Sequence, residues 1–525
     1  MTDTRRWTGG TIFTGLRRVE ALLVDDGRVV HAGTDTEVRR ESPTGTEHEH
    51  LEGRLLLPGF VDAHLHLGEL ARYRTGLSLH DVNSAESLRT RVAEWAILHP
   101  TGPVVGRGWD PEGFRDPASV DLRTLDRAVE DRPVVLYHVS GHAALVNSEA
   151  MRKAADQGGP PPAAAVGRFS DGAPNGVLYE EALRWLGPVV APTFDTAPSV
   201  LVETAEWVAS FGLTTVVTMN AHPKEVSALA EAARNGRLPV RVRAYVSIER
   251  PGAEDLLRPP FPALDRFRVV GAKAFADGAF GPRTAWLSAP YSDAPEGSGR
   301  AVGEDEWLAD RLAAAAEVGL APAVHAIGDR GLVRALGLLA PWSGDPSRPP
   351  ARVEHAALTP PDLLPLLEAV HPALVVQPGF VWSDHWLGRR LGEERARWAY
   401  AFRTLLDRGF LLAGSSDAPF DPLDPWRGLR AAVERVDPDG RSANRSPHEA
   451  LTPEEALRLY TVSAGLAVGE PDLGRLEHGA RADLLVVRAS NLSGALAASG
   501  PPSLETWVGG RRIHPRAAPV AGTTV

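Results

Sequence analysis

The chain of 525 residues contains no cysteine, which excludes a disulfide framework and any zinc site built on thiolates. A bound metal ion would therefore need histidine, carboxylate or a modified side chain as its ligands. Long hydrophobic runs are also missing. No stretch of about 18 uninterrupted apolar residues occurs, and the first residues lack the apolar core of a signal peptide. These absences predict a soluble, cytoplasmic protein.

Strong charge of one sign is absent as well. The net charge is −11, and neither acidic nor basic residues gather in long runs. A nucleic-acid footprint or a surface for anionic lipid would need a basic patch, which the chain does not offer. We therefore expect a small-molecule substrate, no nucleic-acid or membrane partner, and a homodimer as one possible assembly.

Both ends of the chain are rich in short strand-like segments, whereas the middle is not. Hairpin signals occur at Asp25–Gly27 and at Gly509–Gly510, each between two strand-like runs. A chain of this length can hold one large domain and a small one. We predict that residues 1–57 and 466–525 together form a small β-sandwich domain, and that residues 58–465 form the large domain.

The large domain alternates apolar strand-like runs with Ala- and Leu-rich helical stretches, which is typical of parallel βα units. Eight such runs are present, at residues 59–67, 213–219, 240–248, 268–276, 321–328, 351–357, 373–379 and 410–419. The pattern predicts an α/β protein with a (β/α)8 TIM barrel, whose active site lies at the carboxyl ends of the strands. Because the first gap is too long for one helix, we expect an insertion at about residues 100–190.

Two histidines, His64 and His66, end the first apolar run in LLLPGFVDAHLHLGEL. Their side chains lie on the same face of a strand, at a spacing that suits two ligands of one cation. The spacing alone is weak support, because EHEH contains His48 and His50 in the same arrangement within a polar stretch. In the apolar strand the alternatives are a metal site and two hydrogen-bonded core histidines.

Three further side chains stand at the carboxyl ends of other predicted strands. They are His325 in APAVHAIGD, His355 in ARVEHA and Asp417 in FLLAGSSDAP. Each alone could be a core histidine or a helix cap. Together with the first two histidines they make a donor set suited to Zn²⁺, with Mn, Fe, Co or Ni as alternatives.

Lysine is scarce in this chain, since only three of the 56 basic residues are lysines. One of them, Lys273, lies in the fourth predicted strand, within VVGAKAFADG. It could extend outward to solvent or pair with Asp277. Unlike arginine, however, a buried lysine can lose its proton and react with CO2 to give a carbamate, which could bridge two cations.

These residues resemble the amidohydrolase superfamily in its binuclear form. The segments SGHAALVNS, KAFADGAFGPRTA, HAIGD, RVEHA, QPGF, GSSDAP and GRLEHGARADLLVV are similar to the branch that contains N-substituted formamide deformylase and the YtcJ-like hydrolases. The resemblance spans nearly the whole chain. It is specific for the superfamily and uninformative about the substrate.

The resemblance implies a metal-dependent hydrolase with one or two divalent ions, Zn²⁺ first among them. It implies one ion on His64, His66 and Asp417, a second on His325 and His355, and carboxylated Lys273 between them. Two cations would lower the pKa of a shared water enough to supply hydroxide. Lys273 and Asp417 are the implied catalytic residues, with Asp417 as base and then acid.

Five more residues are candidates for contact with the substrate. His142 and Trp109 match motifs of the same branch, and three aromatic residues, Trp286, Phe380 and Trp382, follow barrel strands. The alternative for all five is packing. We expect hydrolysis of a non-peptide C–N bond, such as that of an N-substituted formamide. The alternatives are a deaminase, a cyclic-amide or ureide hydrolase of the same superfamily, and a barrel that binds metal and ligand without catalysis.

Overall fold

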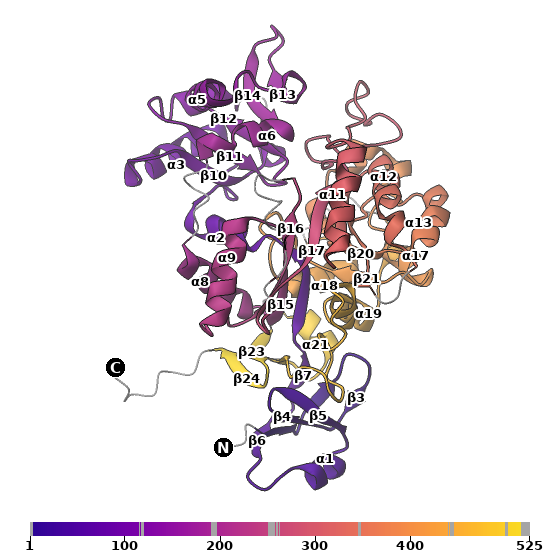
Figure 1. Cartoon of the computed structure of the whole chain (residues 1–525). Helices are drawn as coiled ribbons and strands as arrows, with labels where there is room; N and C mark the ends of the chain where they lie inside the picture. Colours follow the sequence, from indigo (N-terminus) through magenta and orange to yellow (C-terminus); the bar gives the residue numbers. More distant parts are fainter. Residues whose placement is uncertain are drawn as a thin grey trace.

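The structure is a computed structural model that describes residues 4–114, 116, 120–190, 197–249, 258, 261, 263–344, 348–438, 440, 446–498 and 502–515. Its centre is an eight-stranded parallel sheet surrounded by helices (Figure 1). In chain order the strands are β8 (Phe60–Leu65), β15 (Leu213–Ala221), β16 (Arg241–Ser247), β17 (Phe267–Phe275), β18 (Ala321–Ala326), β19 (Arg352–His355), β20 (Ala373–Val376) and β21 (Leu412–Gly414). All eight predicted strands are therefore confirmed.

The sheet closes where the segment after β21 meets β8. The backbone N–H of Asp417 donates to the carbonyl of His64 at 2.8 Å, and that of His66 donates to the carbonyl of Ala418 at 2.8 Å. Each strand thus has a neighbour on both sides, which is the arrangement of the predicted (β/α)8 barrel. Closure also brings the first and last predicted site residues together.

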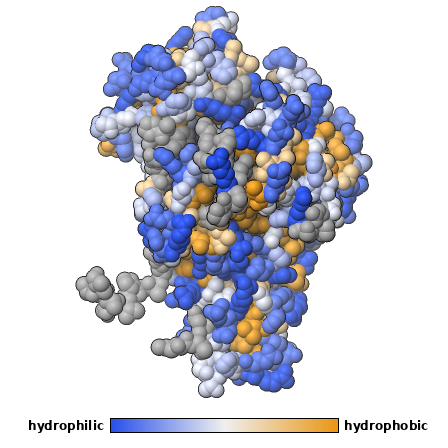
Figure 2. All heavy atoms as spheres, in the orientation of Figure 1, coloured by the Kyte–Doolittle hydropathy of each residue, from blue (hydrophilic) through white to orange (hydrophobic). Residues whose placement is uncertain are grey.

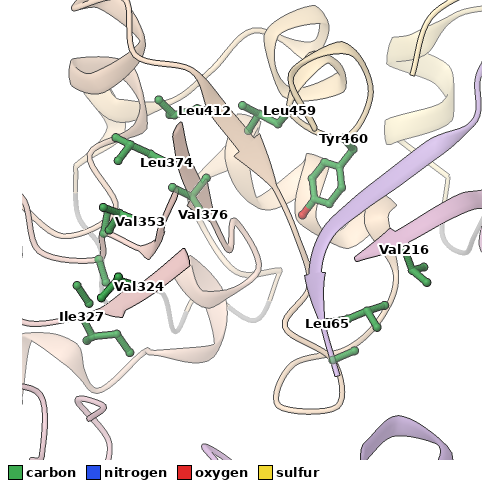
Figure 3. Close-up of a cluster of buried hydrophobic side chains, with 14 of the residues drawn as sticks. Leu65, Val216, Val324, Ile327, Val353, Leu374, Val376, Leu412, Leu459 and Tyr460 are labelled. Atoms are coloured by element: carbon green, nitrogen blue, oxygen red, sulfur yellow. The ribbon is translucent and has the colours of Figure 1, made fainter. Parts of the chain in front are cut away.

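Alternation along the strands separates two cores. In β18, Val324 and Ala326 belong to the large cluster that packs against the outer helices, whereas Ala321 and Ala323 belong to a cluster inside the barrel. Figure 3 shows Val324 next to Val353 of the neighbouring strand β19, with Leu374 of β20 beyond Val353. Residues of the opposite parity, such as His325, therefore face the interior.

Helices lie between the barrel strands and cover the barrel's outer face. They include α2 (Leu67–Thr75), α8 (Pro198–Ala209), α9 (Pro223–Arg234), α11 (Asp305–Glu317), α12 (Asp329–Leu339), α13 (Leu364–Val370), α17 (Phe402–Asp407), α18 (Pro425–Glu434) and α19 (Pro453–Leu459). By contrast, α20 (Val462–Ala467) packs against strand residues that face the barrel interior, such as Val375 and Ala413. Leucines at helical spacing on α11 and α12, Leu308, Leu312, Leu332 and Leu336, are buried in the large cluster. Among the described helices, none is both long enough and apolar enough to span a bilayer.

Both termini contribute to two sheets next to the barrel. One sheet contains β1 (Arg5–Thr8), β4 (Ala21–Asp25), β5 (Arg28–Gly33) and β6 (Glu47–His50). The other combines β2 (Thr11–Phe13), β3 (Arg18–Val19) and β7 (Leu55–Pro58) with β22 (Leu484–Val487), β23 (Ser503–Val508) and β24 (Arg511–His514). Trp7, Leu22, Leu56 and Leu484 share one hydrophobic cluster, so the two sheets pack face to face as a composite sandwich. The domain boundaries at residues 57 and 466 stay predictions.

A separate sheet forms from the long segment between β8 and β15 (Figure 1). Its strands are β9 (Leu77–Ser78), β10 (Val104–Trp109), β11 (Val134–His138), β12 (Ala143–Val146), β13 (Val166–Arg168) and β14 (Pro174–Tyr179). β9 and α3 (Ala85–Leu98) lie before residue 100 but share this sheet and its hydrophobic cluster. The inserted unit thus begins earlier in the chain than the expected boundary.

The visible face of the molecule is mostly hydrophilic, with apolar residues in separate patches (Figure 2). This distribution fits a chain with 23% charged residues.

Candidate active site

The predicted metal ligands meet at the carboxyl ends of the barrel strands. His64 lies in β8 and His66 directly after it, Lys273 lies in β17, His325 in β18, His355 ends β19, and Asp417 follows β21. The imidazole ring centroids are 5.3 Å apart for His64 and His66, 5.2 Å for His64 and His355, and 4.5 Å for His325 and His355. The structure thus brings all four histidines into one group.

The Asp417 carboxylate lies close to the imidazoles of both His64 and His66. Its Oδ1 atom is 3.2 Å from Nε2 of His64 and 3.2 Å from Nε2 of His66. His64, His355 and Asp417 each place one donor atom within 4.8 Å of the others, close enough to hold one ion. This group includes His355, whereas the resemblance assigned His66 to the same ion as His64 and Asp417.

Each histidine of the group uses one ring nitrogen for a hydrogen bond to an oxygen atom. Nδ1 of His66 contacts the carbonyl of Met219 at 3.1 Å, and Nε2 of His325 contacts the carbonyl of Gly278 at 2.9 Å. Because a carbonyl oxygen only accepts, these nitrogens carry the proton and the other ring nitrogen keeps its lone pair. A lone pair on the free nitrogen is what a metal ion requires.

The other two histidines have side-chain partners. Nδ1 of His64 is 2.6 Å from a carboxylate oxygen of Glu354, and Nδ1 of His355 is 2.7 Å from Oε1 of Gln377. Neither Glu354 nor Gln377 was predicted from the sequence. The one available signal for Glu354 was its place beside His355 in a buried strand, where an acidic side chain needs a partner.

Burial keeps two of the imidazoles neutral. It lowers the pKa of His355 to about 3 and the pKa of His325 well below its ordinary value. For His64, burial acts in the same direction, but the charges of Asp417 and Glu354 outweigh it and raise the pKa. Burial would raise the pKa of Asp417, yet the neighbouring His64 holds it well below the usual range. Asp417 is therefore ionised.

Lys273 is the unusual member of the site. Its side chain is 1% exposed, and Nζ has no hydrogen-bond partner within the described part of the chain. The ammonium lies 5.0 Å from the ring centroid of Phe275. Burial lowers the pKa of Lys273 to about 8, so the neutral amine is a minor form at pH 7 and reaches about half of the population at about pH 8.

Two ligands have a backbone conformation that non-glycine residues rarely adopt. The φ angle is +75° at His355 and +59° at Asp417. Such angles cost energy and concentrate at functional sites, where the surrounding structure maintains them. In this barrel, backbone hydrogen bonds to His64 hold Asp417 in place.

Buried carboxylates support the loops behind the ligands. Asp277 accepts backbone N–H groups from Trp286, Ile327 and Gly328, at 2.8 to 3.0 Å, and burial raises its pKa to about 7. Among the residues that the structure describes, Asp277 makes no hydrogen bond with Lys273, and it orders the segment after His325 instead. Asp62, which was not predicted, accepts the backbone N–H groups of His64 and Ser416 at 3.1 Å.

A cavity of about 540 Å³ lies above the ligands, between the inserted unit and the barrel. Its barrel side includes His325, His355 and Asp417, and its inserted side includes His138 and His142. Two predicted substrate residues, Phe380 and Trp382, line it as well. Further aromatic walls come from Phe280, Trp386 and Phe420. The cavity can hold a small organic molecule next to the histidines.

His142 reaches this cavity from the inserted unit. Its ring centroid is 5.2 Å from that of His325, and its Nδ1 atom is 3.1 Å from a carboxylate oxygen of Glu180. Burial would lower the pKa of His142, but the Glu180 carboxylate outweighs burial and raises it. The sequence motif pointed to His142 and not to its partner Glu180.

The remaining two candidates lie elsewhere. Trp109 is 4% exposed, belongs to the hydrophobic cluster of the inserted unit and does not line the cavity. Trp286 is also absent from the cavity wall, and the guanidinium of Arg330 lies 5.2 Å from its ring centroid. Neither residue therefore lies on the cavity wall, and their contact with the substrate stays a prediction.

Comparison with known proteins agrees with this architecture. The model of the amidohydrolase family matches residues 49–514. YtcJ of Bacillus subtilis (strain 168), named as an amidohydrolase, is 33% identical over 511 residues, which cover 92% of this chain and 93% of YtcJ. The N-substituted formamide deformylase of Arthrobacter pascens is 25% identical, over 89% of this chain and 90% of its own.

A solved structure shares the whole fold. The crystal structure of an uncharacterized metal-dependent hydrolase from Pyrococcus horikoshii OT3 matches with a TM-score of 0.76 at 30% identity, covering 93% of this chain and 98% of that chain. The resemblance to the amidohydrolase superfamily, and to the branch with YtcJ and N-substituted formamide deformylase, is confirmed. The chain belongs to the amidohydrolase family and is a metal-dependent hydrolase of carbon–nitrogen bonds.

Proposed function

We propose that the protein hydrolyses N-substituted amides, N-substituted formamides first among them, at a centre of two divalent ions bridged by carboxylated Lys273. One observation carries the two-ion centre: a buried lysine without a hydrogen-bond partner in the described residues stands among four histidines. Lys273 is on β17, which pairs with the strand that carries His325, and the ring of Phe275 lies 5.0 Å from its Nζ and 5.1 Å from the His325 ring. A bare ammonium would be costly at this position.

The donor atoms fit divalent ions. Oδ1 of Asp417 is buried without a hydrogen bond among the described residues, although it faces Nε2 of His64 and of His66 at 3.2 Å. The carboxylate oxygen and the two Nε2 lone pairs repel one another at this distance, and a cation bound between them would stabilise the arrangement. His64, His66 and Asp417 would hold one ion, and His325 and His355 the other. A set of nitrogen and oxygen donors without thiolate suits Zn²⁺.

The carbamate requires only the amine and carbon dioxide. The neutral Nζ of Lys273 adds to the carbon of CO2, an N–C bond forms, and one proton is released. The product is an anion with two oxygen atoms, and through them Lys273 would serve as a ligand of the metal ions. Burial of Lys273 favours this reaction because it favours the neutral amine.

Catalysis divides between the ions and the side chains around the cavity. When bound, the ions would polarise the substrate carbonyl and lower the pKa of a water molecule. Asp417 is placed to take the proton of the attacking water and to deliver it to the leaving nitrogen. That delivery matters because the nitrogen leaves readily as a neutral amine and very poorly as an amide anion. His142, positioned by Glu180, would hold the substrate carbonyl.

The substrate class rests on the cavity and on one relative. Aromatic walls formed by Phe280, Phe380, Trp382 and Trp386 suit an apolar nitrogen substituent of moderate size. The Arthrobacter pascens relative is named for N-substituted formamides. The chemistry of the site would also accept other acyl groups on the same nitrogen.

Metal removal tests the proposal directly. Dialysis against a chelator is expected to abolish hydrolysis, and Zn²⁺, Mn²⁺ or Co²⁺ should restore it, because the water is activated only by bound ions. Metal analysis of the purified protein should give about two ions per chain on the proposed ligand set. The activity is measured on a panel of N-substituted formamides, other acyl amides and cyclic ureides.

The products separate the alternatives. Formate and an amine support the proposal, whereas ammonia would indicate a deaminase and a ring-opened acid a cyclic-amide hydrolase. A fully metal-loaded protein without activity on any of the three classes would contradict the proposed substrate.

Replacement of His142 tests the role of the inserted unit. His142→Gln is expected to lower kcat/KM by about 10- to 100-fold, because one hydrogen bond to a charged group contributes roughly 1.5–3 kcal/mol. The metal content should not change. Trp109→Phe is the matched control, since Trp109 packs inside the same unit without lining the cavity. Steady-state kinetics that show equal losses for the two variants would argue against substrate contact by His142.

A further inference from the structure

A buried ion pair lies inside the barrel directly beneath the metal ligands. Arg352 and Glu354 are both on β19, and both side chains are fully buried. The guanidinium donates to the Glu354 carboxylate at 2.8 Å and 3.0 Å. It also lies 4.5 Å from the ring centroid of Tyr245. Two charges buried without solvent persist only when their geometry satisfies both.

The pair reaches across the barrel to β8. Glu354 accepts the hydrogen bond from Nδ1 of His64 at 2.6 Å, while Nη2 of Arg352 donates to the carbonyl of Ala63 at 2.7 Å. Glu354 thus holds the side chain of His64, and Arg352 holds the backbone of β8 next to it. Nε2 of His64 is left facing Asp417.

The other histidines lack such a partner. His66 and His325 contact the backbone carbonyls of Met219 and Gly278, and His355 contacts the neutral amide of Gln377. The Asp277 carboxylate lies 3.7 Å from Nε2 of His325, which is too far for a hydrogen bond. Among these four histidines, only His64 therefore has a carboxylate hydrogen-bonded to the nitrogen opposite the site. A carboxylate that accepts the distal N–H increases the basicity of the ligating nitrogen and fixes the ring orientation more strongly than a neutral acceptor does.

We propose that Glu354 and Arg352 are positioning residues that make the His64–His66–Asp417 position the tighter of the two metal positions, so that it fills first when metal is limiting. The existence of two positions rests on the proposed function, whereas the role of Glu354 toward His64 does not. The asymmetry follows from the one imidazole in the group that is hydrogen-bonded to a carboxylate, at 2.6 Å, whereas the carboxylate nearest to His325 is 3.7 Å away. An enzyme of this kind passes through a stable form with one ion before it becomes fully loaded.

The proposal is tested by metal affinity and not by activity. Apo protein is titrated with Zn²⁺ in competition with a chromophoric chelator, and the wild-type chain is expected to show a tight first equivalent and a weaker second. Glu354→Gln alone would leave Arg352 buried without a counter-charge and could prevent folding. The double variant Arg352→Gln/Glu354→Gln removes both charges together. It should weaken the first equivalent by about 10- to 100-fold.

Gln377→Leu is the matched control, because it removes the partner of His355 and leaves His64 unchanged. It should weaken the second equivalent and leave the first within about threefold of wild type. The absorption spectrum of the first equivalent of Co²⁺ should change in the double variant and stay the same in the control. Thermal unfolding of the apo proteins shows that each variant is folded.

Three results would overturn the proposal in separable ways. If the folded double variant binds its first equivalent of Zn²⁺ with an affinity within about threefold of wild type, Glu354 and Arg352 have no positioning role. If the double variant binds both equivalents of Zn²⁺ more weakly by the same factor, the two metal positions do not differ in the proposed way. A wild-type chain that binds one equivalent contradicts the two-ion centre and the filling order, and the double variant then tests the positioning role on that single ion.

Discussion

Lys273→Ala is expected to release one of the two metal ions and to lower kcat/KM by at least about 100-fold, since even residues behind the ligands typically contribute 10- to 100-fold to metal affinity or activity. The lysine is buried, has no hydrogen-bond partner among the described residues, and lies among the four histidines. Its carbamate would be the one ligand shared by both ions. Metal analysis by atomic emission, together with steady-state kinetics, measures both effects.

Small carboxylic acids provide the discriminating control for this variant. Formate, acetate or propionate can occupy the space left by the lysyl chain and supply two oxygen atoms, so they should restore part of the metal content and activity. Short alkylamines should not. Restoration by amines instead of carboxylates would mean that Lys273 acts through its amine. Lys153→Ala is the matched substitution, because Lys153 is on the surface and contacts Glu149.

Asp417→Asn is expected to lower kcat by about 10³-fold, within the range of 10²–10⁴ that general acid–base catalysis contributes. Asparagine has the same shape but cannot take the proton from water and return it to the leaving nitrogen. KM should change much less than kcat, because the aromatic cavity wall is unaltered. Kinetics at full metal loading are needed, since the same substitution removes one anionic ligand.

A substrate series sharpens this result. Amides with poor leaving amines need the proton most, so the loss of activity should grow as the pKa of the leaving amine rises. A uniform loss across the series would assign Asp417 to metal binding alone. Asp407→Asn is the matched control, because Asp407 pairs with Arg403 at the surface and does not line the cavity.

The placement of the donor residues was largely predictable. His64, His325, His355 and Asp417 each end an apolar run, and in a parallel barrel the carboxyl ends of all strands meet at one rim. The rarity of lysine in this chain made Lys273 conspicuous within its strand. Two aromatic candidates were less well predicted, because Trp109 and Trp286 do not line the cavity. Proximity to a predicted strand end does not show which way a loop side chain points.

The supporting contacts were not predictable, since their partners are far apart in the chain. Glu354 and His64 are separated by 290 residues, and Gln377 and His355 by 22. Neither pair has a spacing that local periodicity could detect. Glu180 and His142, 38 residues apart, meet only because β12 and β14 pair within the inserted sheet.

The order of residues along the chain was sufficient to predict the barrel, the composite terminal sheets and the amidohydrolase family. It was also sufficient to propose the six candidate ligands. These features depend on local patterns: alternating or continuous apolar runs, turn residues, and polar side chains at strand ends. Tertiary structure alone decided which ring nitrogen of each histidine stays free, which carboxylate supports His64, and which aromatic residues line the cavity. The physical reason is barrel closure. Hydrogen bonds between β8 and the segment after β21 bring residues from opposite ends of the sequence within bonding distance, and no local pattern encodes that contact.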